Sequence, residues 1–542
     1  MDAGTAGCAM ALLTRSKPSD AKPSRSVAVE QAANWQPADS LFKPAPKDYD
    51  LVAQLAYMSA LATANVGREN LFAKTAELGY STSGYFHRVH LVAQRLNYDY
   101  ARACQLVADQ TKDERVRSLL LRFSSSLASG ESESVFLARE TEIQLEQYEQ
   151  KYERDLESLR KWTDAYVALM VSVTLVVVVS MVSMMIYSVG TIFILGLATV
   201  MIGIAALGDW IIYRTSPVEP KTHRRPERSK TQEQMFSAAK MLLPAGALLG
   251  ALVAFVFNLG AGLIAAGVAV APVGILAFMD DRRVDQYDRD VSTFLRSLGS
   301  VVGAIGTTVT EGMERLNQRS LASLEQGVRR LHVRLRSGIR PDLCWDRFIS
   351  ETGSELVDRS VSTFWDTTKL GGDPDQIGYL SSLFALKISL MRESRKLVSQ
   401  SFMYLMVPLH AVLVGIMLFV TEVMVVFANQ LAQIQAQAIE TTDPTTTGGI
   451  DVTSVLAFAA PNVTFLRGFA LVVALFLTVV NTWAPHTTAG GHHHKVWAYA
   501  AVTMVMTGLM LLVVPAIVGN LFDSVSAGLV DTSTSQGVPA TP

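Results

Sequence analysis

Residues Glu157–Met185 read ESLRKWTDAYVALMVSVTLVVVVSMVSMM, and this stretch decides the fold class. Charged residues lead, without Pro or Gly, into an apolar run long enough for a bilayer core, which needs roughly 20 residues of helix. Upstream, Leu145, Tyr148 and Tyr152 recur at helical spacing. We therefore predict one continuous helix from about Val135 to Tyr187, roughly 75 Å long, that begins in water and ends inside a membrane.

The composition of the whole chain agrees with a membrane protein. Of its 542 residues, 49% are hydrophobic and 18% are charged, whereas about a quarter of the residues of a soluble protein are charged. A net charge of only −2 argues against a nucleic-acid binder. Cys8, Cys104 and Cys344 lie far apart, so neither a disulfide framework nor a zinc site is indicated.

Seven apolar stretches meet or nearly meet the length of a membrane span. They are Trp162–Tyr187, Thr191–Tyr213, Met241–Asn258, Leu259–Met279, Phe402–Ala428, Phe465–Thr482 and Val496–Leu521. The third and fourth stretches predict a tight hairpin, because the glycines of Gly246–Gly250 and Gly260–Gly262 let helix backbones approach closely.

The distribution of Lys and Arg predicts the orientation of these spans. Basic residues crowd into 214–240 and 281–396, while 397–466 and the residues after Lys495 contain none. With the N-terminus inside and the C-terminus outside, the basic loops face the cytoplasm and the loops that lack Lys and Arg face the exterior. "NVT" at Asn462 matches a glycosylation sequon, but it abuts the sixth span, so we do not expect it to be glycosylated.

The predicted fold class is all-α: a polytopic membrane protein with about seven spans and two repeated cytoplasmic helical bundles. The predicted segments are a flexible tail (1–49), the first bundle (50–161), spans 1–2 (162–213), a basic cytoplasmic loop (214–240), spans 3–4 (241–279), the second bundle (280–401), span 5 (402–428), an extracellular loop (429–463), spans 6–7 with a cytoplasmic loop (464–521) and an extracellular tail (522–542).

The two bundles are predicted from an internal repeat that aligns without gaps. SLASGESESVFL at 126–137 matches TTKLGGDPDQIGYL at 367–380, with Gly130 on Gly371, and Phe123 then falls on Phe364. Glycine suits a left-handed helix C-cap. Gly130, Gly371, Gly372 and Asp373 are candidate joints ahead of the long helices, and the alternative is that they are only caps.

Several stretches together resemble a known superfamily: LAYMSALATANVGRENLF, LNYDYARACQLVADQT, FLRSLGSVVGAIGTTVTEGM and TKLGGDPDQIGYL, with GGHHHKVW between the last two spans. They are similar to the type II secretion system F domain of type IV pilus and secretion platform proteins. Within it, the chain looks most like the archaellum (archaeal flagellum) assembly platform of the FlaJ type. One departure is Glu131, where that family usually has a second glycine.

The resemblance implies a motility protein that assembles and rotates a filament. Its implied partners are a cytoplasmic hexameric ATPase, filament subunits (archaellins or pilins) and a second copy of the chain in a homodimer. The alternative is a platform for a non-rotating adhesive type IV pilus or secretion system. A secondary transporter is disfavoured, since such proteins need polar groups near the bilayer midplane and the predicted spans are almost wholly apolar there.

No catalytic motif is present: the sequence lacks GxxxxGK[ST], HExxH and GxSxG, so we predict no enzymatic activity and no cofactor. His492, His493 and His494 are adjacent on a loop and cannot easily face one ion, so a solvated loop is favoured over a metal site. The candidate ATPase contacts are Lys221, Arg224, Arg225, Arg228, Lys230, Arg329, Arg330, Arg334, Arg336 and Arg340.

These basic residues have alternative interpretations. One interpretation is that they set the membrane topology and attract anionic lipid. Another is that they bind an acidic surface of the ATPase. Nucleic-acid binding is the least favoured, because no aromatic residues that could stack on bases lie between the basic ones. Charges inside spans are costly, and Glu422 and Arg467 both fall within the outer third of a span. They are a candidate intramembrane ion pair, with separate snorkelling as the alternative.

Overall fold

The computed structural model describes residues 47–186, 191–223, 225, 227–441 and 463–534, and in that part of the chain no strand is formed beyond one isolated bridge between Thr222 and Ser354. The predicted all-α class is confirmed. The described residues divide into two compact units: Gly67–Glu131 (unit 1), and those of Ala45–Val66 and Ser132–Pro542 (unit 2). Cys8, Asn462 and Arg224 lie outside the described residues.

Unit 1 is a small helical bundle around an aromatic core. Its helices are α3 (Arg68–Glu77), α4 (Ser83–Leu96), α5 (Tyr100–Gln110) and α6 (Glu114–Ser129). Phe72 stacks on Phe123 with ring centroids 5.6 Å apart, and both side chains are buried. The side chains of Asp99 and Asp113 cap the next two helices by accepting backbone N–H groups, which explains where these helices begin.

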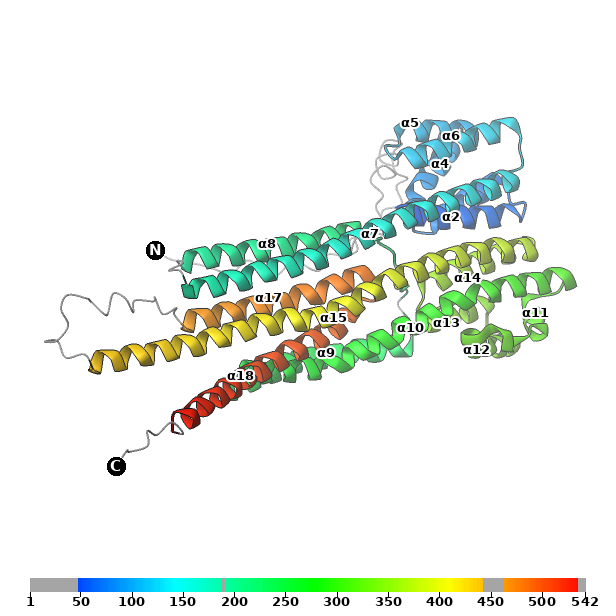
Figure 1. Cartoon of the computed structure of the whole chain (residues 1–542). Helices are drawn as coiled ribbons and strands as arrows, with labels where there is room; N and C mark the ends of the chain where they lie inside the picture. The colour runs from blue at the N-terminus through cyan, green and yellow to red at the C-terminus, as the bar shows by residue number, and fades with distance from the viewer. Residues whose placement is uncertain (1–46, 187–190, 224, 226, 442–462, 535–542) are drawn as a thin grey trace, which may run out of the picture. The chain divides into compact units, whose positions relative to one another are not determined.

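Unit 2 contains the long helices (Figure 1). Its elements are α2 (Lys47–Ala62), α7 (Glu133–Ile186), α8 (Thr191–Thr215), α9 (Lys230–Val256), α10 (Leu259–Ile305), α11 (Val309–Arg315), η1 (Gln318–Leu324), α12 (Glu325–Arg336), α13 (Pro341–Thr352), α14 (Glu355–Lys369), α15 (Pro374–Thr441), α17 (Val463–Ala489), η2 (His493–Lys495) and α18 (Val496–Thr534).

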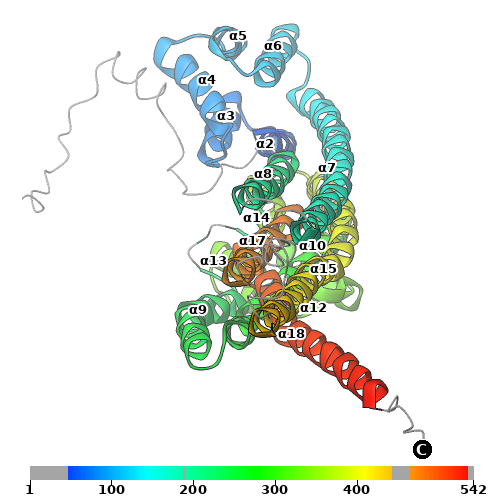
Figure 2. The ribbon, with the colours of Figure 1, turned by 60° about the vertical axis from the view of Figure 1, so that its left-hand side comes forward.

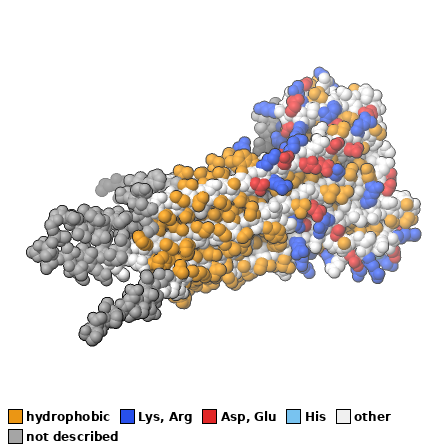
Figure 3. All heavy atoms as spheres, in the orientation of Figure 1, with side chains coloured by type: hydrophobic (Ala, Val, Ile, Leu, Met, Phe, Trp, Pro, Cys, Tyr) orange, Lys and Arg blue, Asp and Glu red, His pale blue; other side chains and the backbone are white. Residues whose placement is uncertain are grey.

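Six described helices are long and apolar enough to cross a membrane: Glu133–Ser183, Lys230–Val256, Leu259–Ile305, Pro374–Gln430, Val463–Ala489 and His493–Phe522. Six of the seven predicted spans overlap these helices. The other prediction, Thr191–Tyr213, coincides with α8, part of whose side chains are not described. Hydrophobic side chains cover one end of unit 2, and charged side chains gather toward the other (Figure 3). Unit 2 is therefore a multi-pass membrane unit.

The predicted hairpin of the third and fourth spans is confirmed. Helices α9 and α10 lie side by side (Figure 2), joined at Asn258, whose side chain accepts from the backbone N–H of Ala261 at 2.8 Å. A Cβ added to Gly262 would lie 2.6 Å from the carbonyl oxygen of Gly250, and one added to Gly250 would lie 2.6 Å from the Cβ of Ala266. Only glycine permits this approach.

The internal repeat appears as two helix pairs with the same order of elements. Helices α5 and α6 match α13 and α14, and α7 or α15 follows. The aligned residues Phe123 and Phe364 are both buried, as are Val116 and Val357. The repeated sequence therefore encodes the same local packing twice.

The compact units do not follow the domain boundaries expected from the sequence. Of the predicted first bundle, 50–161, only residues 67–131 form unit 1, while α2 and the start of α7 group with unit 2. Within unit 2, Tyr49 on α2 lies 6.3 Å from the ring of Tyr148 and 6.2 Å from that of Phe384. Burial of this aromatic surface joins α2 to α7 and α15.

Candidate functional site

The second predicted joint is a glycine turn between α14 and α15. Gly371 has φ +88°, a left-handed conformation that favours glycine. A Cβ on Gly372 would lie 2.7 Å from Cδ1 of Ile377 and 2.9 Å from Oγ1 of Thr63. The carboxylate of Asp373 accepts from the backbone N–H of Asp375 at 3.1 Å and caps α15. Gly371 thus provides the left-handed backbone, Gly372 the space for neighbouring side chains, and Asp373 the cap of α15.

The first predicted joint differs from the second. Gly130 ends α6 with φ +75°, and nothing would lie within 4 Å of an added Cβ. Glu131 accepts a hydrogen bond from Ser126 Oγ at 3.0 Å. At Gly130 the backbone conformation alone favours glycine, whereas at Gly372 it is close packing that favours glycine.

The predicted basic residues between the second and third spans have different environments. Arg225 lies 2.7 Å from Asp358 and 2.5 Å from Asp346. The guanidinium of Arg228 lies 4.1 Å from the ring centroid of Phe236, and both Arg228 and Lys230 are exposed. The side chain of Lys221 is only 15% exposed and lies between the carboxylates of Asp281 and Asp285.

The predicted basic residues of 329–340 form a surface on α12 and the start of α13. Arg329 pairs with Glu325 at 2.8 Å and Arg336 with Glu314 at 3.6 Å. Arg330 and Arg334 share Glu351, and Arg340 is exposed at the N-cap of α13. Burial raises the pKa of Glu351, but the two arginines outweigh this effect and hold the pKa below its ordinary value. Arg329, Arg330 and Arg336 nevertheless remain exposed.

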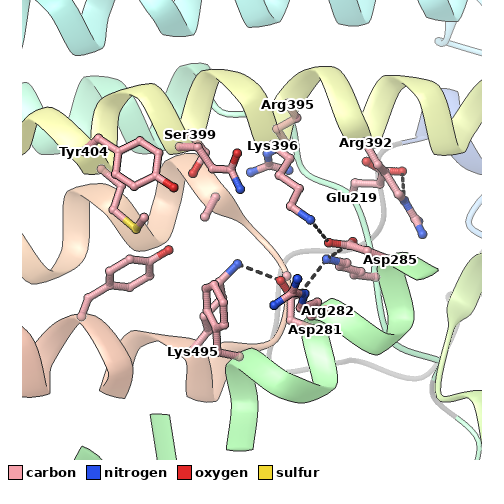
Figure 4. A pocket seen from close by; sticks show the side chains of 17 residues that line it. Glu219, Asp281, Arg282, Asp285, Arg392, Arg395, Lys396, Ser399, Tyr404 and Lys495 are labelled. Atoms are coloured by element: carbon pink, nitrogen blue, oxygen red, sulfur yellow. Dashed lines mark hydrogen bonds and ion pairs between the residues drawn. The ribbon is translucent and has the colours of Figure 1, made fainter. Parts of the chain in front are cut away.

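A charged junction that was not predicted from the sequence surrounds Asp281 and Asp285 (Figure 4). Lys221 Nζ is 2.7 Å from Asp281 and 2.5 Å from Asp285. Lys495 approaches Asp281 at 2.8 Å, and Lys396 approaches Asp285 at 3.0 Å. Burial lowers the pKa of Lys221, but the two carboxylates outweigh it and raise the pKa above its ordinary value. The junction joins the segment before α9 to α10, α15 and η2.

Arg392 on α15 extends this junction. It bonds Glu219 at 2.7 Å and Asp288 on α10 at 2.6 Å, and Asp288 also accepts from Ser354, the N-cap of α14. All four side chains are buried or nearly so. Sequence reasoning missed these residues because charges in a helical stretch look the same whether solvent or another helix faces them.

The two candidate membrane charges lie in contact. Arg467 Nη2 on α17 donates to Glu422 Oε2 on α15 at 2.9 Å. The Glu422 side chain is 15% exposed and that of Arg467 is 56% exposed. The carboxylate is therefore largely covered by other side chains, while much of the Arg467 side chain lies on the outer surface of the helices.

A chain of buried polar side chains, which the sequence analysis did not single out, links four of the membrane helices. Buried Tyr166 donates to Asn481 Oδ1 at 3.1 Å, and Asn481 Nδ2 donates to His410 Nδ1 at 2.9 Å. His410 Nε2 then carries the proton and lies 2.9 Å from the hydroxyl of Thr507, which is 2.7 Å from that of Thr478. Single polar residues on four different helices do not stand out in a sequence, but here they satisfy one another and hold the helices together.

The expected solvated histidine loop is also corrected. His492 is buried, and its ring lies 5.5 Å from that of Phe236, while the His494 ring lies 4.9 Å from the same phenyl group. Burial, followed by the nearby His494 and His493, lowers the pKa of His492 to about 4. The loop therefore packs on α9 with His492 neutral.

The fold and the charged junction define a class: an all-helical, multi-pass membrane protein whose longest helices continue far beyond the membrane. The chain is 24% identical over 323 residues to Flagella accessory protein J of Methanocaldococcus jannaschii, and 24% identical over 324 residues to the protein of that name from Methanococcus voltae. Each match covers 57% of this chain and 57% of the relative. No family model and no solved structure matches. These similarities confirm the resemblance to the FlaJ type.

Proposed function

We propose that this chain is a non-enzymatic membrane platform for the assembly of an archaellum, a filament of the type IV pilus kind. The observation that carries the proposal is the continuity of α7 and α15, which run unbroken from charged, water-soluble segments into the apolar spans. At 54 and 68 residues, they are about 80 and 100 Å long. A displacement at one end of such a helix is carried into the bilayer.

The proposed orientation puts both repeated bundles and the charged junction in the cytoplasm, with the N-terminus inside and the C-terminus outside. The distribution of Lys and Arg along the sequence supports this orientation. Filament subunits carrying apolar helices would meet the outer parts of the spans. A second copy of the chain would complete a homodimer.

A cytoplasmic hexameric ATPase is the proposed source of motion. Its candidate contact is the exposed basic surface of α12 with Arg340, together with Arg228 and Lys230. Lys221, with a side chain only 15% exposed, is better suited to holding the helices together, and Arg225 to holding the 221–230 segment on α14 through Asp358. The chain itself carries no nucleotide-binding motif, so ATP hydrolysis by the purified protein alone would contradict the proposal.

The experiment that tests the ATPase contact uses charge reversal on α12. In the variant Arg329→Glu/Arg336→Glu, we expect the protein to insert normally but to lose filaments and co-purification of the ATPase. Arg102→Glu, an exposed arginine on α5 of unit 1, is the matched control. Normal filaments in the α12 variant would remove this surface from the proposal.

A platform for a non-rotating adhesive pilus or secretion system is the second candidate, because it requires the same long helices. Cells that carry this chain as their sole platform distinguish the two. Swimming with rotating filaments supports the archaellum, whereas surface attachment without swimming supports the adhesive pilus.

A further inference from the structure

A cavity of about 340 Å³ lies within unit 2, where three predicted spans begin or end. Its walls come from α10, α15, α18 and the segment before α9 (Figure 4). The predicted span boundaries Met279, Phe402 and Val496 all fall next to residues of its lining. The cavity therefore lies at the level where a bilayer meets water.

The charges around this cavity do not balance. Its cationic lining residues are Lys221, Arg282, Arg392, Arg395, Lys396 and Lys495. Three carboxylates, Glu219, Asp281 and Asp285, also line it, and Asp288 adds a fourth from behind Arg392. Positive charge exceeds negative charge by two even with that fourth carboxylate.

Two arginines account for the excess. Arg395 is only 7% exposed, yet its recorded partners are the neutral oxygens of Ser216, Pro217, Thr487 and Thr488. Arg282 is exposed and forms no ion pair within the described residues. Burying a charge without a counter-charge is costly, so an anion in this cavity would stabilise the protein.

The rim of the cavity is apolar on the membrane side. Tyr404 is 70% exposed and Phe278 is 44% exposed, and Met403 and Tyr499 also line the cavity. A phosphate group with a hydrocarbon tail fits this arrangement, since its charge would meet the arginines while its chains would follow the exposed faces of α10 and α15.

We propose that this cavity binds the phosphate headgroup of an anionic membrane phospholipid, with Arg282 and Lys396 at its accessible edge and Arg395 behind them. The site does not depend on the filament function. A bound headgroup would hold α10, α15 and α18 at a fixed depth in the bilayer, next to the charged junction.

Native mass spectrometry of the full-length protein in detergent tests the proposal, with phosphatidylglycerol, phosphatidylcholine and inorganic phosphate as probes. We expect wild type to retain phosphatidylglycerol over phosphatidylcholine. The variant Arg282→Gln/Lys396→Gln should lose phosphatidylglycerol affinity by about thirtyfold, because it removes two cationic contacts. Arg283→Gln removes an exposed neighbour that bonds Thr231 and lies outside the lining, so this control should bind as wild type does.

Three results would overturn the proposal. The double variant could retain phosphatidylglycerol as wild type does, or wild type could bind both lipids equally. The third contradicting result is that inorganic phosphate displaces phosphatidylglycerol at equal concentration, which would make the cavity a site for a free anion. Equal melting temperatures of the double variant and wild type in lipid-free detergent show that any lost binding is not caused by unfolding.

Discussion

Gly371 and Gly372 show how two adjacent identical residues are required for different reasons. Gly371 is required by its backbone conformation, and Gly372 by what surrounds it: the side chains of Ile377 and Thr63 and the carbonyl oxygen of Thr367. Thr63 follows α2, so the second glycine determines how closely the end of α2 approaches the turn. In the first joint the position aligned with Gly372 is occupied by Glu131, whose carboxylate accepts a hydrogen bond from Ser126 Oγ at 3.0 Å.

Replacing Gly372 by alanine should therefore do more harm than replacing Gly371. Overpacking typically costs about 1–3 kcal/mol, whereas a left-handed alanine costs roughly 1–2 kcal/mol and displaces no neighbour. We expect Gly372→Ala to abolish filaments while leaving membrane insertion intact, and Gly371→Ala to reduce filament number. Electron microscopy of whole cells and a membrane fractionation blot measure the two effects. Normal filaments in both variants would leave these residues as caps alone.

The pair of Glu422 and Arg467 permits a charge-swap test. Glu422→Arg places a cation beside Arg467, and Arg467→Glu places an anion beside Glu422, so each single variant should lower the melting temperature in detergent. The double variant restores opposite charges across the 2.9 Å contact and should recover most of the loss. If the double variant is as unstable as the sum of the singles, each residue reaches the headgroups separately.

The pKa of His492 predicts a pH dependence of stability. The value is about 4 in the folded protein and about 6.5 in an unfolded chain, so the unfolded state binds more protons between these values. The free energy of unfolding should be fully maintained above pH 6.5 and should decrease as pH falls toward 4. His492→Asn keeps a side-chain acceptor at the start of η2 and should flatten this slope in thermal unfolding curves. An unchanged slope would exclude His492 as its source.

At the scale of elements, the important property of α7 and α15 is that they are continuous. Pro408 lies inside α15, and the helix continues through it. Outside the apolar spans, Lys387 on α15 bonds Glu149 on α7 at 2.7 Å, and α2 packs against both helices. Buried Arg359 on α14 bonds Asp50 on α2 at 2.7 Å. These contacts make α2, α7, α14 and α15 one packed group.

A proline in α7 tests whether this continuity matters. Gln147 is exposed and lies well before the predicted span, so Gln147→Pro should break the helix at a cost of about 3 kcal/mol without altering the apolar segment. We expect normal insertion and no filaments. Gln147→Ala, which preserves the helix, should assemble filaments as wild type does; filaments in the proline variant would contradict mechanical coupling through α7.

At the scale of the whole molecule, the proposal depends on both repeated bundles facing the same side of the membrane. Single cysteines at Glu153 on α7 and at Arg330 on α12, both exposed, report that side in a chain whose three native cysteines have been replaced. We expect both to react with a membrane-permeant maleimide in intact cells and neither with an impermeant one. Labelling of one site by the impermeant reagent would place the bundles on opposite sides and remove the proposed coupling.

The sequence by itself determined the helical class, the positions of the apolar spans, the α9–α10 hairpin, the long α7 and the paired repeats. Each of these depends on the periodicity of apolar residues, the length of an apolar run or the position of glycines, and each of these patterns is read within a short stretch of sequence. The FlaJ resemblance was also visible at this level.

Only the tertiary structure decided which charges meet. Lys221, Lys396 and Lys495 are distant in sequence from Asp281 and Asp285, and nothing in the local pattern distinguishes Lys221, whose side chain is only 15% exposed, from Arg228, which is exposed. The chain of Tyr166, Asn481, His410 and Thr507 likewise forms only when four helices pack. Burial and hydrogen bonding are properties of the space between helices, and that space exists only after the helices have come together.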